Sequence, residues 1–107
     1  MKGFTDINQS KILLKILSTE GADMCYQYQK DRWVDEPAYK EYPQFEIVMD
    51  KRDIPCWSLA ALLGVLPNST DICKNIEGRY YVHGFFSDNP VDACVDAIKA
   101  LHELNLL

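Results

Sequence analysis

The sequence predicts an α+β fold in which three helices pack on one face of an antiparallel sheet of about four strands, in the order α-β-β-α-β-β-α. Three segments, near the start, middle and end of the chain, place apolar residues at helical spacing directly after a capping residue. Between these segments lie short stretches in which apolar and polar residues alternate, as in half-buried strands. Each interval holds two such stretches, which favours two hairpins joined in one sheet.

Residues 6–21 are predicted to form the first helix. Asp6 is a suitable N-cap, and Gln9 three positions later completes a capping box that satisfies exposed backbone amides. Gly21 can adopt the left-handed conformation that ends many helices, so we expect the helix to end there. The apolar stripe consists of Ile12, Leu13, Ile16 and Leu17.

Strands are expected on both sides of a charged, aromatic segment. Met24, Tyr26 and Tyr28 alternate with their neighbours as in a half-buried strand. Residues 32–34 are a candidate for a short returning strand, and residues 44–50 alternate again. The two stretches flanking residues 30–43 therefore supply the first pair of strands.

The stretch IPCWSLAALLGVLP, residues 54–67, raises the question of whether Ser58 is a nucleophile or a helix cap. Apolar residues follow it at the spacing i, i+3, i+4 and i+7, and Pro67 ends the pattern, which predicts a short helix capped by the Ser58 hydroxyl. Trp57 stands where a residue often packs back onto the first turn. The glycines of a nucleophile elbow are absent, so we expect a cap that Asp could replace and no catalytic role.

The remaining elements are a hairpin and a closing helix. Residues 71–86 contain two apolar runs joined at Glu77 and Gly78, where glycine accepts a positive φ. Asn89, Pro90 and Asp92 form a strong helix start, because they supply the N-cap, the first residue and a negative charge near the positive helix end. The apolar face of this helix consists of Val91, Val95, Ile98 and Leu101, widened by Ala93, Ala97, Ala100 and Leu104.

Length and composition favour one globular domain spanning residues 1–107. The apolar fraction of 48% and the charged fraction of 25% are typical of soluble globular proteins. The net charge is −5 and no segment is basic, which argues against nucleic-acid binding. The longest apolar run, residues 59–66, contains Gly64 and is too short to cross a bilayer, so we expect no membrane segment.

The four cysteines, Cys25, Cys56, Cys73 and Cys94, have none of the short spacings of zinc or redox motifs. The first residues lack the pattern of a secretory leader, so we expect a cytoplasmic protein with free thiols. Cys94 and His102 share a helix but lie about 12 Å apart along its axis, too far to bind one ion. We therefore expect neither a metal nor a cofactor.

His83 is the candidate catalytic residue. It lies in a predicted strand, where a structural role is the simpler interpretation. A general base would need a nucleophile and an orienting carboxylate, and the sequence brings neither to it. Asp88, Asp92 and Asp96 recur at helical spacing, but helix-start chemistry and a solvated face account for them. A small enzyme that uses His83 with an acidic partner is therefore the alternative function.

Trp33, Tyr39 and Tyr42 lie in the charged segment 30–43, which also contains two prolines. These rings either cover the sheet edge and core or form a protein-binding surface, because aromatic side chains are enriched at interface hot spots. If the chain is a binder, at least one of the three rings should be more than about a third exposed. The expected partner is a protein, and the chain itself is expected to be a monomer or a weak homo-oligomer.

Residues 54–66 and 85–107 resemble a group of small uncharacterised proteins of gut bacteria and their prophages or mobile elements. The group shares a proline–aromatic–Ser/Thr–leucine helix in mid-chain and a final strand that runs into a helix started by Asn-Pro. The resemblance covers about a third of the chain and is weaker over residues 22–28. It implies a bacterial or mobile-element origin and no assigned activity. The expected function, a non-catalytic binding or accessory protein, follows instead from the aromatic segment 30–43 and from the lack of any nucleophile constellation.

Overall fold

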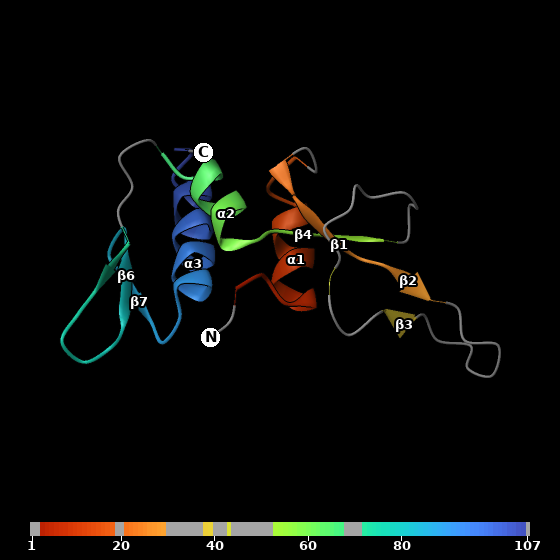
Figure 1. Cartoon of the computed structure of the whole chain (residues 1–107). Coiled ribbons are helices and arrows are strands. Elements are labelled where there is room, and N and C mark those ends of the chain that lie inside the picture. The colour runs from red at the N-terminus through yellow and green to blue at the C-terminus, as the bar shows by residue number, and fades with distance from the viewer. Residues whose placement is uncertain are drawn as a thin grey trace.

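The computed structural model of the chain (Figure 1) describes residues 3–18, 21–29, 38–39, 43, 53–67 and 72–106, with the backbone alone for residues 29, 38 and 39. Its helices are α1 (Ile7–Leu14), α2 (Leu59–Val65) and α3 (Pro90–Glu103). Its strands are β1 (Met24–Tyr26), β2 (Tyr28–Gln29), β3 (Ala38–Tyr39), β4 (Ile54–Cys56), β5 (Cys73–Lys74), β6 (Tyr80–Val82) and β7 (Phe85–Ser87). The α+β class and the predicted order of helices and strand pairs are confirmed. The strands expected at residues 32–34 and 44–50 lie outside the described residues.

The predicted single sheet of about four strands is wrong. The described strands form three small antiparallel sheets, β1–β4, β2–β3 and β5–β6–β7. The helices lie between the β5–β6–β7 sheet and the other two sheets (Figure 1), so they do not share one face of one sheet. The reason is that β1 pairs with β4, far along the chain, while β6 and β7 pair locally, and α3 packs between these groups.

Helix α1 begins as predicted and ends earlier. The Asp6 carboxylate accepts from the Gln9 amide at 2.7 Å, and the Gln9 side chain accepts from the Asp6 amide at 3.1 Å, which confirms the capping box. After Leu14 the backbone tightens, because the Lys15 N–H bonds to the carbonyl of Ile12. The predicted end at Gly21 is wrong, since this glycine does not have a positive φ.

Helix α2 confirms the interpretation of Ser58 as an N-cap. Its hydroxyl accepts from the Ala61 amide at 3.2 Å. The helix ends at Val65, just before Leu66 and Pro67. Asp23, which precedes β1, also accepts hydrogen bonds from both the backbone N–H and the hydroxyl of Ser58. The sequence did not predict this second role, in which Ser58 joins the start of α2 to the start of β1.

The main hydrophobic core lies where α2 and α3 meet the β5–β6–β7 sheet. Its centre is the α2–α3 contact, and Leu13 is its only fully buried contributor from α1 among the described residues. The predicted apolar face of α3 is buried as far as Ile98, half-buried at Ala100 and Leu101, and exposed at Leu104, which lies beyond the helix. The buried members of this core are Leu13, Trp57, Leu62, Leu66, Val82, Val91, Ala93, Cys94, Val95, Ala97 and Ile98.

A second, smaller core lies between α1 and the β1–β4 pair. The strand register places Met24 opposite Cys56 and Tyr26 opposite Ile54, so these four side chains share one face. Phe4 and Ile7 pack against this face. The segment before α1 is held alongside the β4–α2 connection by backbone bonds, including one from the Thr5 N–H to the Trp57 carbonyl at 3.0 Å.

Both ends of α3 have capping motifs. The Asn89 side chain accepts from the Asp92 amide at 2.8 Å and Pro90 is the first helical residue, as predicted. The C-terminal end closes with Asn105 at a φ of 58°, and the amides of Asn105 and Leu106 bond back to His102 and Leu101. This double back-bonding with asparagine in the left-handed region is a Schellman motif.

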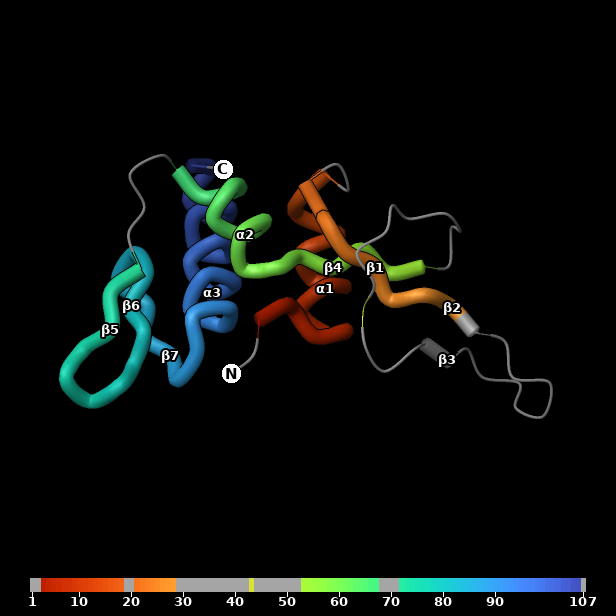
Figure 2. Tube along the Cα trace, in the orientation of Figure 1, coloured from red at the N-terminus to blue at the C-terminus, as the bar shows by residue number. Residues whose placement is uncertain are grey.

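The β5–β6–β7 sheet contains two hairpins (Figure 2). The first turns at residues 75–78, where Gly78 has a φ of 81°, which confirms the predicted hairpin. The second turns at His83 and Gly84, whose φ angles are 47° and 87°. Two successive positive φ angles between paired strands define the tight turn that matches strand twist. The assignment of His83 to a strand is therefore wrong: this residue forms half of a two-residue turn.

Candidate functional site

The outward face of the β5–β6–β7 sheet presents a row of uncharged side chains. The register aligns Cys73 with Tyr81 and Tyr81 with Phe86, and residues directly opposite each other share a face. Tyr81 is 38% exposed, Phe86 is 51% exposed, and Cys73 is also exposed. The Tyr81 and Phe86 ring centroids lie 4.8 Å apart with the planes tilted by 50°. We call these three residues the aromatic row.

The opposite face of the same sheet is covered by α3. Val82 is fully buried there, and its strand partner Phe85 packs against the main core. Alternation along a strand requires that the neighbours of these residues point the other way. Tyr81 and Phe86 therefore face away from the core, and no element of the described chain covers them.

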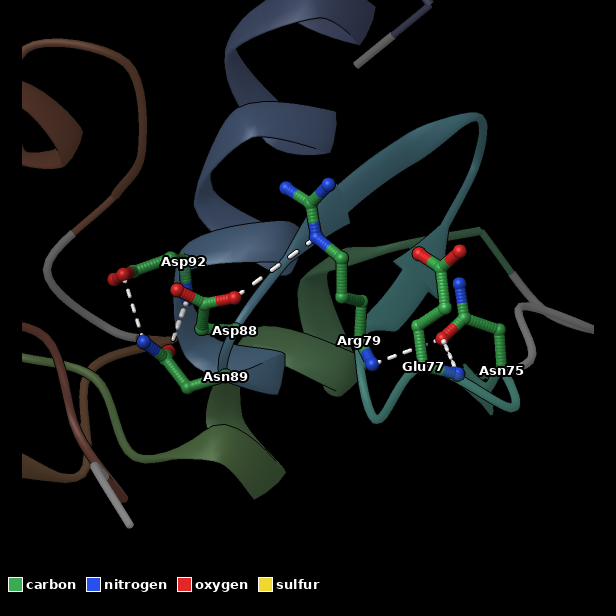
Figure 3. A network of polar contacts seen from close by, with 6 residues as sticks. All are labelled: Asn75, Glu77, Arg79, Asp88, Asn89 and Asp92. Atoms are coloured by element: carbon green, nitrogen blue, oxygen red, sulfur yellow. Dashed lines mark hydrogen bonds and ion pairs between the residues drawn. The ribbon is translucent and has the colours of Figure 1, made fainter.

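The turn between β5 and β6 is held by a set of hydrogen bonds centred on Asn75 (Figure 3). The Asn75 side-chain oxygen accepts from the amides of Glu77 and Arg79 at 3.1 and 2.9 Å. The Asn75 carbonyl accepts from Gly78, and the Asn75 N–H donates to the Arg79 carbonyl. The turn is thus well ordered, yet it carries a fully exposed apolar residue, Ile76.

Two charged side chains of opposite sign follow the aromatic row along its strands. Arg79 and Asp88 approach to 3.9 Å across the β6–β7 strands (Figure 3), and both are well exposed. The Lys74 ammonium lies 5.7 Å from the centre of the Tyr80 ring, and this pair belongs to the other face of the sheet, because Lys74 and Tyr80 alternate with Cys73 and Tyr81. An exposed ion pair of this kind contributes little stability. The surface therefore has an uncharged centre and a mixed-charge rim, the composition typical of protein interfaces.

The sequence-predicted contact residues are only partly placed. Trp33 and Tyr42 lie outside the described residues, and Tyr39 is described only by its backbone in β3, where it pairs with Tyr28. The expectation that at least one of these three rings is exposed stays a prediction. The structure does not bring Tyr39 to the aromatic row, since β3 and the β5–β6–β7 sheet lie at opposite ends of the molecule (Figure 1).

His83 is exposed at the turn between β6 and β7. This turn lies at the end of the sheet opposite to the Asn75 turn, because successive hairpin turns alternate between the two ends. Within the part of the chain that the structure describes, no group of three or more His, Cys, Asp or Glu side chains could hold a metal ion. The enzyme hypothesis for His83 stays a prediction.

The cysteines differ in their surroundings. Cys25, Cys56 and Cys94 are buried, Cys73 is exposed, and all four are free thiols. Burial raises the pKa of the Cys94 thiol from 9.0 to about 11, and burial also raises the pKa of Cys56. Because the thiolate is the reactive form, the buried Cys56 and Cys94 are poor nucleophiles.

Cys56 belongs to a buried polar cluster centred on Thr5. The Thr5 hydroxyl lies 2.8 Å from the Ser10 hydroxyl and 3.5 Å from the Cys56 sulfur, and it accepts from the Trp57 amide at 3.2 Å. The Tyr26 hydroxyl donates to the Thr5 carbonyl at 2.7 Å. Burial is the main reason that the pKa of Tyr26 is raised, so its phenol stays protonated. The cluster is closed to solvent and joins α1, β1 and β4 internally.

Sequence reasoning missed Tyr81 and Phe86 as surface residues. Residues 80–86 resemble one continuous apolar strand, in which neither ring stands out. The available signal was His83–Gly84, because glycine is favoured at positive φ and histidine is among the few other residues enriched there. A two-residue turn at this position predicts that Tyr81 and Phe86 are cross-strand neighbours.

No protein-family model, curated protein or solved structure matches this chain. Across the described residues, none of the helices has the length and apolar character needed to cross a membrane.

Proposed function

We propose that this chain is a small non-catalytic binding protein that acts through a protein partner, and that the aromatic row is its contact surface. The observation that carries the proposal is the exposure of Tyr81 and Phe86 as a packed cross-strand pair on the uncovered face of a sheet. Large aromatic side chains dominate binding energy at protein interfaces, above all where they cluster.

The rigidity of the surface supports the same proposal. Both rings stand on strands that α3 holds from behind, and the adjoining turn is ordered by the Asn75 hydrogen bonds. A preordered surface loses little conformational entropy when it binds, so more of the contact energy appears as affinity. Ile76 in that turn is a further exposed apolar side chain of the same hairpin.

The size of the surface indicates a modest affinity. A stable interface buries about 800 Å² on each partner, whereas the aromatic row supplies only two large rings. Charged residues next to the row, Arg79, Glu77 and Asp88, would provide the rest of such an interface. We therefore propose a reversible complex and a chain that is a monomer or a weak homo-oligomer on its own.

The segment with Trp33, Tyr39 and Tyr42 remains a second proposed contact for the same function, supported by its composition. A cytoplasmic location is proposed on the basis of the free thiols. A bacterial or mobile-element origin is proposed on the basis of the resemblance over residues 54–66 and 85–107.

The test compares binding of the parent chain with that of Phe86→Ser and Tyr81→Ser. Leu14→Ser is the matched control, because Leu14 is 41% exposed and lies on α1, away from the sheet. Partners are first captured from the source cells through a photoreactive phenylalanine analogue at position 86, with the same analogue at position 14 as background. Affinities are then measured with the purified partner.

The proposal expects each sheet variant to weaken the complex by about 1–3 kcal/mol, or roughly 5- to 150-fold, while Leu14→Ser leaves it unchanged. Equal binding by all three variants would remove the aromatic row as the contact. If only Trp33→Ala or Tyr42→Ala then weakened the complex, the contact would lie in that segment. Failure to cross-link any protein from position 86, or from the same analogue placed at position 42, would contradict the binding function itself.

A further inference from the structure

We draw no further inference here: the strongest candidate, the exposed Cys73–Tyr81–Phe86 row on the outward face of the β5–β6–β7 sheet, belongs to the surface already proposed as the partner contact, and nothing in the structure shows what covers it.

Discussion

Replacing Thr5 with valine tests whether the buried polar cluster holds the N-terminal segment in place. Valine has nearly the shape of threonine but no hydroxyl, so the change removes hydrogen bonds with little change in volume. The Trp57 amide loses the acceptor at 3.2 Å, and the Ser10 hydroxyl loses its neighbour at 2.8 Å. Thr5 and Ser10 are both fully buried, so water does not replace the lost group.

The expected loss of stability follows from these two contacts. A buried polar group left without a partner costs about 1–3 kcal/mol. The Trp57 amide is left without an acceptor and contributes the whole of this cost. The Ser10 hydroxyl can rotate toward the carbonyls of its own helix, so its loss is smaller. Thr5→Val should therefore lower the free energy of unfolding by about 2–4 kcal/mol. The Tyr26 bond to the Thr5 carbonyl is a backbone contact and should persist.

Urea unfolding followed by far-ultraviolet circular dichroism measures this loss. Thr5→Ser is the control, because it keeps the hydroxyl, removes one methyl group and should cost only about 1 kcal/mol. A double-mutant cycle with Ser10→Ala should give a coupling of about 1 kcal/mol between the two hydroxyls. The reasoning is refuted if Thr5→Val matches the stability of the parent chain, or if Thr5→Ser is the more damaging of the two.

Three further predictions concern a cap, a turn and a thiol. Ser58→Asp should lower the free energy of unfolding by about 1 kcal/mol, because the new carboxylate lies next to that of Asp23. Adding Asp23→Asn should restore this loss in urea unfolding, and simple additivity of the two substitutions would contradict the reasoning. Gly84→Ala should lower the free energy of unfolding by about 1–2 kcal/mol, because alanine is strained at a φ of 87°. Gly64→Ala inside α2 should raise the free energy of unfolding slightly, because alanine favours helix more than glycine does. Equal effects of the two substitutions would contradict the left-handed turn at Gly84. Burial raises the pKa of the Cys94 thiol from 9.0 to about 11, so the protonated thiol is favoured in the folded state. The free energy of unfolding should therefore be constant below pH 9 and fall by about 2–3 kcal/mol as the pH rises through about 11. Cys94→Ala should flatten that alkaline decline in denaturant titrations at several pH values, and an unchanged slope would exclude this source.

The helix starts and the first hairpin could be predicted because their signals are local. A capping side chain bonds to an amide two or three positions later, so Asp6, Ser58 and Asn89 each act within one turn of their own helix. Gly78 likewise permits a turn between strands that are its immediate neighbours. Where a structure depends on residues this close together, the order of the residues is sufficient to predict it.

The division into separate sheets could not be predicted, because it depends on which distant strands meet. β1 lies opposite β4, with Met24 facing Cys56, although more than 25 residues separate the strands. Alternating hydrophobicity marks a strand but does not identify its partner. The link between Asp23 and Ser58 has the same origin, since it exists only after β1 and β4 have paired. For this reason the role of Ser58 as a cap was visible in the sequence and its second contact was not.

The proposed contact surface shows how one missed turn changes a functional interpretation. In a continuous strand over residues 80–86, Phe86 would share the face of Val82 and enter the core, because side chains alternate strictly. The His83–Gly84 turn reverses the chain and places Phe85 opposite Val82, which leaves Phe86 beside Tyr81 on the outer face. A shift of one residue in this turn would exchange the two phenylalanines between core and solvent. The geometry of an exposed two-residue turn therefore determines which aromatic ring is available for binding.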